Sequence, residues 1–406
     1  MMRDKNSSIK PDLLILVSAV SLLCVGLIMV SSASMLIAED KFSNTFHFVL
    51  RHGISIFIAT CCAVLMYQIP MRVWERFSSI LYFLALFMLV VVLVFGNTVN
   101  GSTRWLNLGL MNFQPSELAK IFVLIYMASF IVRKKDEVQA QIRGILKPTA
   151  ILFIPAILLL LEPDFGSVVV LCIATFSMLF MGGVKIRYFA LAIFLGAVVF
   201  YILLITQPYR VARLTAFLNP WDNQFGSAYQ LVQSLIAYGR GEWFGQGYGN
   251  SVQKLFYLPE AHTDFLIAVL AEEFGLFGVM IVLGLFSTLV LSALFISRAA
   301  EKRGAYFSAY LGYGLSVLIG IQALFNFGVT MGLLPTKGLT LPLVSYGGSS
   351  LLSTCFLLAI LLRINKENTL ACETMKRTKK KASKSKKKSN VKPPSDSLDV
   401  RTGVAA

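Results

Sequence analysis

The chain has 406 residues, of which 56% are hydrophobic and only 14% are charged. A soluble globular domain usually carries about 25% charged residues, so this composition argues against a soluble protein. The net charge of +16 does not indicate a nucleic-acid partner, because 13 Lys and Arg against 4 Asp and Glu are concentrated from Arg363 to the end.

Ten apolar segments predict the fold. A bilayer core of about 30 Å needs about 20 apolar residues in a helix. We therefore predict an all-α, polytopic integral membrane protein with about ten transmembrane helices. In chain order the segments are Leu13–Leu36, Phe46–Tyr67, Phe77–Gly96, Pro115–Val132, Pro148–Leu161, Phe165–Gly183, Tyr188–Thr206, Thr263–Ser297, Ala305–Leu334 and Pro342–Leu362.

The distribution of Lys and Arg in the short loops predicts the orientation. If the N-terminus is cytoplasmic, the inner short loops hold twelve basic residues and the outer connections hold four. We expect both termini in the cytoplasm, with residues 1–12 as an N-terminal tail and residues 13–364 as the membrane domain. Residues 365–406 form a basic tail poor in apolar residues, which predicts disorder. This tail suits either attraction to anionic lipid or docking of a partner.

One long outer loop, residues 207–262, separates the seventh and eighth predicted helices. Within it, Tyr229, Val232 and Ile236 have the spacing of a short amphipathic helix. Glycines then recur from Gly239 to Gly249 and indicate irregular backbone. A structured loop of this length is more often functional than idle.

Asp264 is the strongest candidate for catalysis. Pro259 ends the outer loop, and Thr263 is a plausible N-cap for the next helix. The helix dipole would then favour an ionised Asp264 at the outer membrane boundary. Such a carboxylate can act as a general base or hold a divalent cation, and simple helix capping is the structural alternative.

Other ionisable residues inside apolar segments need a reason, because burial in the membrane costs several kcal/mol. Glu117 and Lys120 are three residues apart and share a helix face. They form either a structural ion pair or the polar floor of a site open to the outside. Glu272 and Glu273 lie about 12 Å deeper than Asp264 along their helix and must also face protein or water.

Basic and aromatic residues near the outer face indicate an anionic substrate. Arg104 suits phosphate or diphosphate, and Arg213 and Lys337 add positive charge. Trp105 either anchors at the interface or stacks on a sugar. Ser345 begins a run of small residues that suits close helix packing or reaches the same site. With six scattered cysteines and three histidines, a His/Cys metal site is not expected.

Four segments together resemble the SEDS family, named for shape, elongation, division and sporulation. The matching segments are Phe113–Lys120, Tyr229–Ser234, Gly249–Phe265 and Ser345–Ser350. The resemblance covers roughly Leu13–Arg363. Within the family, the sequence from Leu258 to Phe265 and that from Lys337 to Tyr346 are more similar to the cell-division branch than to the elongation branch.

The resemblance implies a peptidoglycan glycosyltransferase that polymerises lipid II during septal wall synthesis. It also implies a bacterial cytoplasmic membrane location at the division septum, with a class B penicillin-binding transpeptidase, other divisome membrane proteins and membrane lipid as partners. Asp264 matches the family's essential outer carboxylate. Two departures are Glu162, where the family usually has Gln, and Ser102-Thr103 before Arg104. The substrate-binding residues that we assign are Arg104, Trp105, Glu117, Lys120, Arg213, Gln230, Gln233, His262, Lys337 and Ser345.

As a mechanism, Asp264 would take the proton from the acceptor 4-hydroxyl while that oxygen attacks C1 of the donor sugar. Arg104, Lys120 and a divalent cation, Mg²⁺ or Mn²⁺, would neutralise the leaving diphosphate. No organic cofactor is expected. Two rival hypotheses are a lipid II flippase, which would use the buried charges as a hydrophilic path, and a noncatalytic divisome scaffold.

Overall fold

The computed structural model describes residues 11–389, except residues 100–101, 108–111, 207 and 337. Some side chains within helices and strands, including that of Arg213, are also outside the described structure. The chain divides into two units, Met1–Asn365 and Lys366–Ala406. The first unit contains the membrane bundle and the candidate site.

Among the described residues, eight helices are long and apolar enough to cross a membrane. Two further apolar helices, α8 (Phe165–Met181) and α9 (Ile186–Ile205), coincide with the sixth and seventh predicted segments. The prediction of an all-α membrane fold is therefore confirmed. The eight are α1 (Pro11–Phe42), α2 (His47–Gln68), α4 (Ser78–Phe95), α5 (Pro115–Arg133), α7 (Arg143–Leu161), α12 (Leu266–Lys302), α13 (Tyr306–Thr330) and the first part of α14 (Gly348–Ser389).

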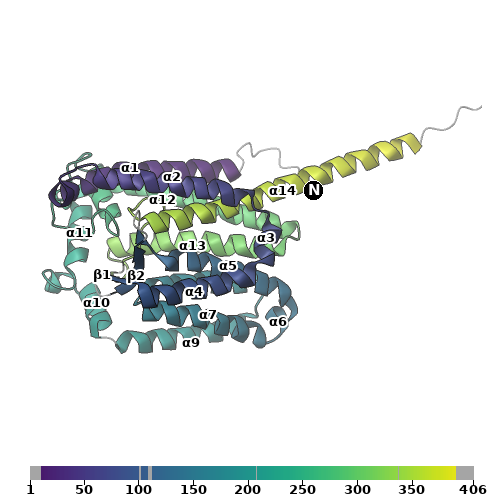
Figure 1. The fold of residues 1–406 in the computed structure, drawn as a ribbon, viewed down its shortest axis with the longest axis horizontal. Coiled ribbons are helices and arrows are strands. Elements are labelled where there is room, and N and C mark those ends of the chain that lie inside the picture. Colours follow the sequence, from purple (N-terminus) through teal and green to yellow (C-terminus); the bar gives the residue numbers. More distant parts are fainter. Residues whose placement is uncertain (1–10, 100–101, 108–111, 207, 337, 390–406) are drawn as a thin grey trace, which may run out of the picture. The chain divides into compact units, whose positions relative to one another are not determined.

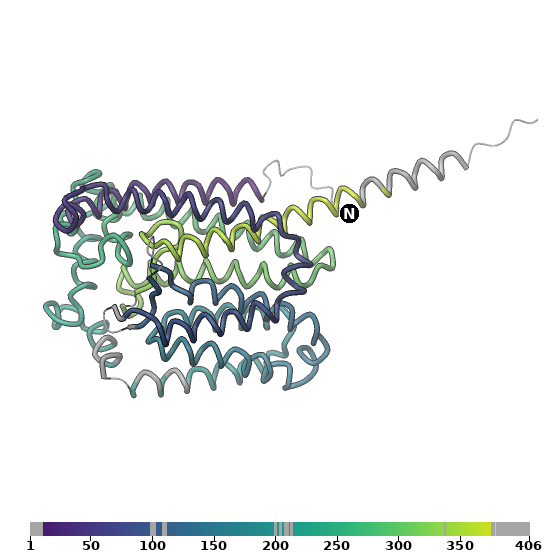
Figure 2. Tube along the Cα trace, viewed as in Figure 1, coloured from purple at the N-terminus to yellow at the C-terminus, as the bar shows by residue number. Residues whose placement is uncertain are grey.

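The long helices of the first unit run side by side, and the trace passes back and forth between two ends of the bundle (Figures 1 and 2). The short helices α3 (Met71–Arg76) and α6 (Lys135–Ala140) lie at one end. The opposite end carries α10 (Pro208–Leu218), α11 (Tyr229–Gly241) and a small sheet, and we call it the loop end.

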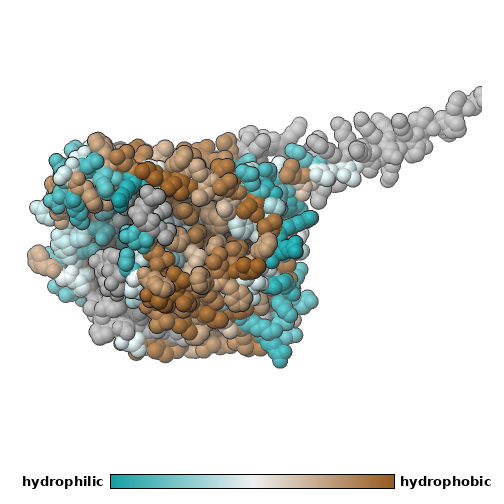
Figure 3. Space-filling model, viewed as in Figure 1, coloured by the Kyte–Doolittle hydropathy of each residue, from teal (hydrophilic) through white to brown (hydrophobic). Residues whose placement is uncertain are grey.

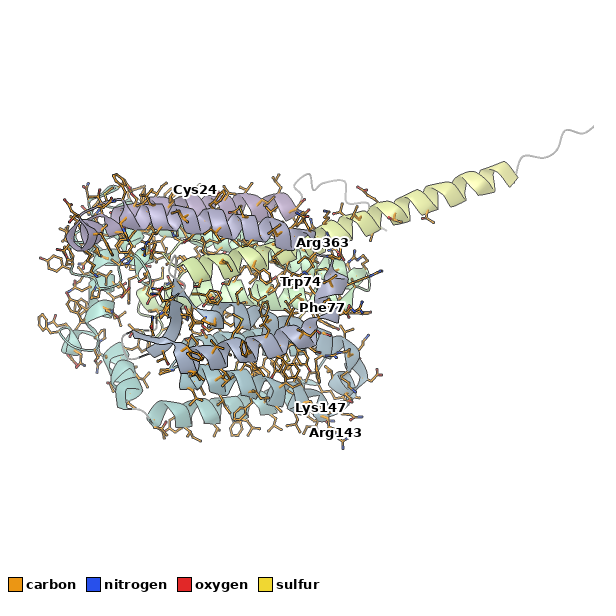
Figure 4. The ribbon with its side chains drawn as sticks, viewed as in Figure 1. Cys24, Trp74, Phe77, Arg143, Lys147 and Arg363 are labelled. Carbon is orange, nitrogen blue, oxygen red and sulfur yellow. The ribbon has the colours of Figure 1, made fainter. Side chains whose placement is uncertain are left out.

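Surface hydropathy matches a membrane-embedded bundle. A hydrophobic belt lies between two hydrophilic ends of the bundle (Figure 3). Arg143, Lys147 and Arg363 lie at the end opposite the loop end (Figure 4). Such an arrangement, with basic residues gathered at one end, is typical of the cytoplasmic side of membrane proteins.

The core of the bundle is built around α5 and α13, whose side chains are mostly buried. α5 packs against α4, α8 and α13, while α12 packs against α1, α11 and α13. Polar residues on α5 and on the outer part of α12 therefore meet protein rather than lipid.

The predicted outer loop contains the amphipathic helix expected from the sequence, now α11. Its buried face joins a small apolar cluster of Ala216, Ala228, Val232 and Ile236. The short 3₁₀ helix η1 (Trp221–Asn223) lies between α10 and α11. The prediction of a structured loop is confirmed.

A three-stranded antiparallel sheet at the loop end was not expected from the sequence. Its strands, β1 (Asn97–Val99), β2 (Ser102–Asn107) and β3 (Asn112–Phe113), pair in chain order. Val99 lies opposite Ser102. The overlooked signal was the Asn-Gly dipeptide between these two residues in the sequence, which favours two-residue hairpin turns.

The start of α12 differs from the prediction. The helix begins at Leu266, so Thr263 is not its N-cap and Asp264 lies just before the first turn. The Thr263 hydroxyl donates to the Glu260 carboxylate at 2.7 Å and to the Glu260 carbonyl at 3.2 Å instead of capping the helix. Side chain and backbone thus form a local turn that delays the helix.

The first part of the basic tail also differs from the prediction, because α14 continues to Ser389 where disorder was expected from residue 365. Residues 390–406 lie outside the described residues. From Gly348 to Ser389 the sequence has no proline, and Lys and Ala are good helix formers. A composition poor in apolar residues argues against burial in a core, but it does not prevent a helix.

A kink interrupts α12 at Gly275, which has φ +68° and ψ −169°. Only glycine occupies this region readily, and other residues there cost about 1–3 kcal/mol. A Cβ at this position would also lie 2.5 Å from the Gly245 nitrogen and from the Trp243 carbonyl.

We therefore expect Gly275→Ala to lower the melting temperature of the detergent-purified protein by several degrees. Gly284→Ala is the matched control in the same helix, since a Cβ there meets no atom within 4 Å. Thermal unfolding followed by fluorescence measures both variants, and equal melting temperatures would contradict a strained kink.

Candidate active site

The outer loop is attached to the bundle by α11. The Ser234 hydroxyl donates to the Thr330 carbonyl at 2.7 Å, and the Tyr238 hydroxyl lies 3.2 Å from the Thr330 hydroxyl. Gly241 contacts α12 so closely that a Cβ would lie 1.9 Å from the Ala271 carbonyl oxygen. α11 therefore rests directly on the outer parts of α12 and α13.

Glu272, fully buried on α12, holds the chain that follows α11. Its carboxylate accepts hydrogen bonds from the Ser251 hydroxyl and from the backbone N–H groups of Val252 and Gln253, both at 3.2 Å. The Arg240 guanidinium lies 3.5 Å away. This carboxylate is thus satisfied by one short segment of the outer loop.

The neighbouring Glu273 makes a second attachment. Its carboxylate pairs with the Lys254 ammonium at 3.0 Å and accepts a hydrogen bond from the Ser32 hydroxyl of α1 at 2.5 Å. Lys254 also donates to Ser32 at 2.9 Å and to the Gly249 carbonyl at 2.7 Å. We call Ser32, Lys254 and Glu273 the loop clasp, because they join α1, the outer loop and α12.

Asp264 lies where the outer loop returns to the bundle. The Asn326 side chain donates to the Asp264 carbonyl at 2.9 Å and to the Leu339 carbonyl at 2.7 Å. Gly338 approaches the Asp264 carboxylate so closely that a Cβ would lie 2.8 Å from its oxygen. Asp264 as a whole residue is half-buried, and no hydrogen-bond donor among the described residues contacts its carboxylate.

Burial raises the pKa of Asp264 to about 7, and the Glu260 charge raises the pKa further while Arg104 opposes the shift. A carboxylate with this pKa is close to balance between its two protonation states at neutral pH. Such balance suits a group that must accept and release a proton in each turnover.

Arg104 links the sheet to the turn between α7 and α8. From β2, its guanidinium donates to the Glu162 carbonyl at 3.1 Å and to the Pro163 carbonyl. Arg104 also lowers the pKa of Asp264 by its charge. The sequence prediction that Arg104 and Asp264 belong to one site is therefore consistent with their electrostatic coupling.

Glu162 is completely buried, and neither carboxylate oxygen has a partner among the described residues. Burial and the Asp164 charge raise the pKa of Glu162 to about 8, against the opposing effect of Arg104. Asp164 itself caps α8 by accepting from the Ser167 N–H at 3.2 Å. Glu162 is thus largely protonated at neutral pH.

Glu117 and Lys120 form a closed ion pair inside the bundle. The Lys120 ammonium lies 2.8 Å from the Glu117 carboxylate, and the Ser353 hydroxyl of α14 donates to Glu117 at 3.3 Å. Lys120 is 1% exposed. This is the geometry of the structural alternative, and direct substrate binding by these two side chains stays a prediction.

Ser345 and His262 lie beside the Asp264 segment. The Ser345 hydroxyl accepts from the Leu341 N–H at 3.1 Å, and the His262 carbonyl accepts from the Tyr346 N–H at 3.1 Å. The backbone of the Ser345–Tyr346 segment is therefore joined to the chain two residues before Asp264, and contact of the Ser345 and His262 side chains with substrate stays a prediction.

The other predicted binding residues have no described hydrogen bond that joins them to the Asp264 segment. Trp105 is on β2 beside Arg104 and is partly exposed. Gln230 and Gln233 are on α11, which packs against α12 and α13, and no described contact joins them to Asp264. Lys337 and the side chain of Arg213 lie outside the described residues.

Sequence reasoning missed two residues that shape the site. Asn326 fixes the Asp264 backbone, and Glu260 raises the pKa of Asp264. A lone Asn within the apolar segment of α13 was a usable signal, since buried amides need partners. The effect of Glu260 depends on a turn that the sequence pattern did not specify.

Among the described residues, no group of three or more His, Cys, Asp or Glu side chains converges to form a dedicated site for a divalent cation. A protein-built cation cage normally needs several oxygen ligands. Binding of Mg²⁺ or Mn²⁺ therefore stays a prediction, since the described residues alone form no such cage.

The sequence matches a family model described as a cell cycle protein of the FtsW, RodA and SpoVE type over residues 12–370. A relative from Coxiella burnetii, named probable peptidoglycan glycosyltransferase FtsW, is 49% identical over 87% of this chain and 95% of its own. A relative of the same name from Hahella chejuensis is 50% identical over 88% of this chain and 90% of its own.

Solved structures have the same fold. A chain from a peptidoglycan synthase complex, described as coordinating polymerization and crosslinking, is 28% identical with a TM-score of 0.73, covering 87% of this chain and 97% of that chain. The rod shape determining protein RodA of Thermus thermophilus is 24% identical with a TM-score of 0.65, covering 87% of this chain and 96% of that chain. The second likeness concerns the fold alone.

The buried carboxyl of Glu162 leads to a prediction about stability and pH. Its folded pKa of about 8 exceeds the ordinary value of 4.5, so the folded state binds this proton more tightly than the unfolded state. The free energy of unfolding should therefore fall as pH rises from about 4.5 to 8, by about 1.4 kcal/mol per pH unit at most.

Glu162→Gln removes this titration, so the variant should be more stable than the original protein at pH 8 and nearly equal to it at pH 5. Thermal unfolding at both pH values measures the difference. Glu39→Gln, at an exposed position, is the control and should show no such pH dependence. A gain of equal size at both pH values would contradict a raised pKa.

Proposed function

The chain belongs to the SEDS family of membrane proteins, and we propose that its loop end polymerises lipid II with Asp264 as the general base. It is a multi-pass membrane protein and a peptidoglycan glycosyltransferase. The assignment to the FtsW branch rests on relatives about half identical over nearly their whole length. The polymer is expected to be the β-1,4 glycan strand of the septal wall.

One observation carries the chemical role of Asp264. Glu117, Glu272 and Glu273 are buried and paired with cations or other donors. Asp264, in contrast, is partly exposed and has no donor on its carboxylate among the described residues. A general base needs a free lone pair, and the absence of a described donor on the Asp264 carboxylate supports this role.

The proposed step is a single displacement. The Asp264 carboxylate takes the proton from the acceptor 4-hydroxyl, the resulting oxygen attacks C1 of the donor sugar, and the bond from C1 to the diphosphate oxygen breaks. The lipid diphosphate leaves with the electron pair of that bond. Attack from the opposite face inverts C1, which turns an α-linked donor into a β-linked product.

Charge on the leaving group is the second requirement. Arg104 supplies a fixed positive charge beside Asp264, and guanidinium groups suit diphosphate oxygens. Mg²⁺ or Mn²⁺, when bound, would supply further positive charge for the diphosphate. Mg²⁺ commonly binds through one or two carboxylates together with phosphates. Asp264 is the carboxylate available for it.

Orientation and partners follow from the same assignment. We propose that the loop end faces the outside, that both termini are cytoplasmic, and that the protein works at the division septum. The structural likeness to a chain of a peptidoglycan synthase complex supports a class B penicillin-binding transpeptidase as partner. Other divisome membrane proteins and the surrounding lipid complete the expected set.

The flippase alternative gains little support from the structure. It requires the buried charged residues to line a hydrophilic path. Glu117 is closed by Lys120, while Glu272 and Glu273 are occupied by the outer loop. The scaffold alternative makes Asp264 dispensable, so a single substitution separates it from catalysis.

We expect Asp264→Asn to reduce polymerisation of labelled lipid II by about 10²–10⁴-fold, because this range is typical for loss of a general base. The assay uses purified full-length protein with and without its transpeptidase partner. Asp222→Asn removes an exposed carboxylate from the same outer loop and should keep full activity. Undiminished glycan synthesis by Asp264→Asn would remove Asp264 from this role.

The pH dependence gives a second test. Since Asp264 must be ionised to act as a base and its pKa is about 7, kcat/KM should rise about tenfold per pH unit below pH 7 and level off above it. Initial rates of polymerisation between pH 5 and 9 measure this profile. A profile flat from pH 5 to 7 would contradict a base with this pKa.

A further inference from the structure

All three histidines of the chain lie in one cluster of aromatic rings at the loop end. The His262 ring lies 5.1 Å from Phe48 and 5.7 Å from Tyr346, measured between ring centroids. Tyr346 also lies 5.8 Å from His52, and His47 joins through Phe48 at 5.6 Å. We call these five residues the ring cluster.

The ring cluster is joined to the segment that carries Asp264. The Tyr346 N–H donates to the His262 carbonyl at 3.1 Å. Two residues later, the Asp264 carbonyl accepts from the Asn326 side chain at 2.9 Å. The backbone is therefore held on both sides of Thr263, once from the segment before α14 and once from α13.

His52 supports this arrangement from α2. It is fully buried, and neither ring nitrogen has a partner among the described residues. An imidazole without hydrogen bonds acts on its neighbours through its shape. Its aromatic neighbour Tyr346 is the residue whose backbone holds the Asp264 segment. The contacts thus run from α2 through one ring to the backbone beside Asp264.

We infer that His52 and Tyr346 are positioning residues, which hold Asp264 in place through ring packing and the hydrogen bond to the His262 carbonyl. This inference rests on the proposed function of Asp264. Misplacement of a catalytic group by about 1 Å can cost about 10²-fold in rate. Loss of a supporting ring should therefore reduce the chemical step without removing a substrate contact.

The test compares His52→Leu with His52→Phe in the lipid II polymerisation assay. His52→Leu removes the ring and should lower kcat at least tenfold, while KM for lipid II changes by less than twofold. His52→Phe keeps a ring and should retain at least half of kcat, because the ring nitrogens make no described hydrogen bond. Tyr346→Leu and Tyr346→Phe form a second pair, should His52→Leu fail to fold. Tyr346→Phe also loses the hydrogen bond between the hydroxyl and Arg51, so for this pair we expect only that the phenylalanine variant retains more kcat than the leucine variant.

Trp74→Leu is the matched control. Trp74 is buried and packs against Phe356 at 5.5 Å, at the end of the bundle opposite the loop end (Figure 4). The Trp74→Leu variant removes a buried ring that does not contact the Asp264 segment, so kcat per folded molecule should be unchanged. An equal loss in Trp74→Leu would mean that ring removal acts only through general stability, and it would overturn the inference.

Three other outcomes would also overturn it: unchanged kcat in the leucine variants, a rise in KM alone, or equal losses in the leucine and phenylalanine variants. The result for Asp264→Asn distinguishes failure of the proposed function from failure of the positioning role. Full activity of Asp264→Asn contradicts the proposed function itself. Loss in Asp264→Asn with no loss in the ring variants contradicts only the positioning role.

Discussion

Two adjacent carboxylates near the start of α12 hold the loop end together. Glu272 and Glu273 are almost completely buried, and an unpaired charge at such a position would cost several kcal/mol. The partners come from the outer loop and from α1, so these charges are satisfied only when the outer loop is folded against the bundle. Because leaving these buried charges unpaired is costly, the outer loop is held in its folded position against the bundle.

The kink in α12 completes this constraint. Gly275 interrupts the helical hydrogen bonds, and the carbonyls of Glu272 and Glu273 accept instead from the N–H groups of Gln246 and Gly247 at 2.9 and 3.0 Å. Side chains and backbone of the same two glutamates therefore bind one stretch of the loop. Asp264 lies between this stretch and α12, so its position depends on both attachments.

The sequence predicted the helices well because their signal is local. A run of about 20 apolar residues is decisive by length alone, and the amphipathic spacing in α11 is equally local. The loop clasp was out of reach, because Ser32 and Glu273 are 241 residues apart along the chain. Asp264 was identified from its place at the expected start of a helix and then from motif resemblance. Its half-buried, unpaired state depends on Asn326 and on the turn at Glu260, which only packing specifies. The continuation of α14 was not predicted, because a composition poor in apolar residues was taken to exclude a helix as well as a core.

The electrostatics around Arg104 explain how this chain can carry Glu162 at a position where the family resemblance leads us to expect Gln. Within the described structure, Arg104 is the charge that lowers the pKa of both Glu162 and Asp264. An ionised Glu162 would compete for Arg104 with the substrate diphosphate that we propose Arg104 to bind. Burial raises the pKa of Glu162 to about 8, so near neutral pH the side chain is mostly an uncharged acid, comparable to the neutral amide of a Gln. Arg104 then remains available to Asp264 and to the leaving group. Above pH 8 the Glu162 carboxyl would be mostly ionised beside Arg104. Its negative charge, which a Gln amide would lack, would then act on the candidate site.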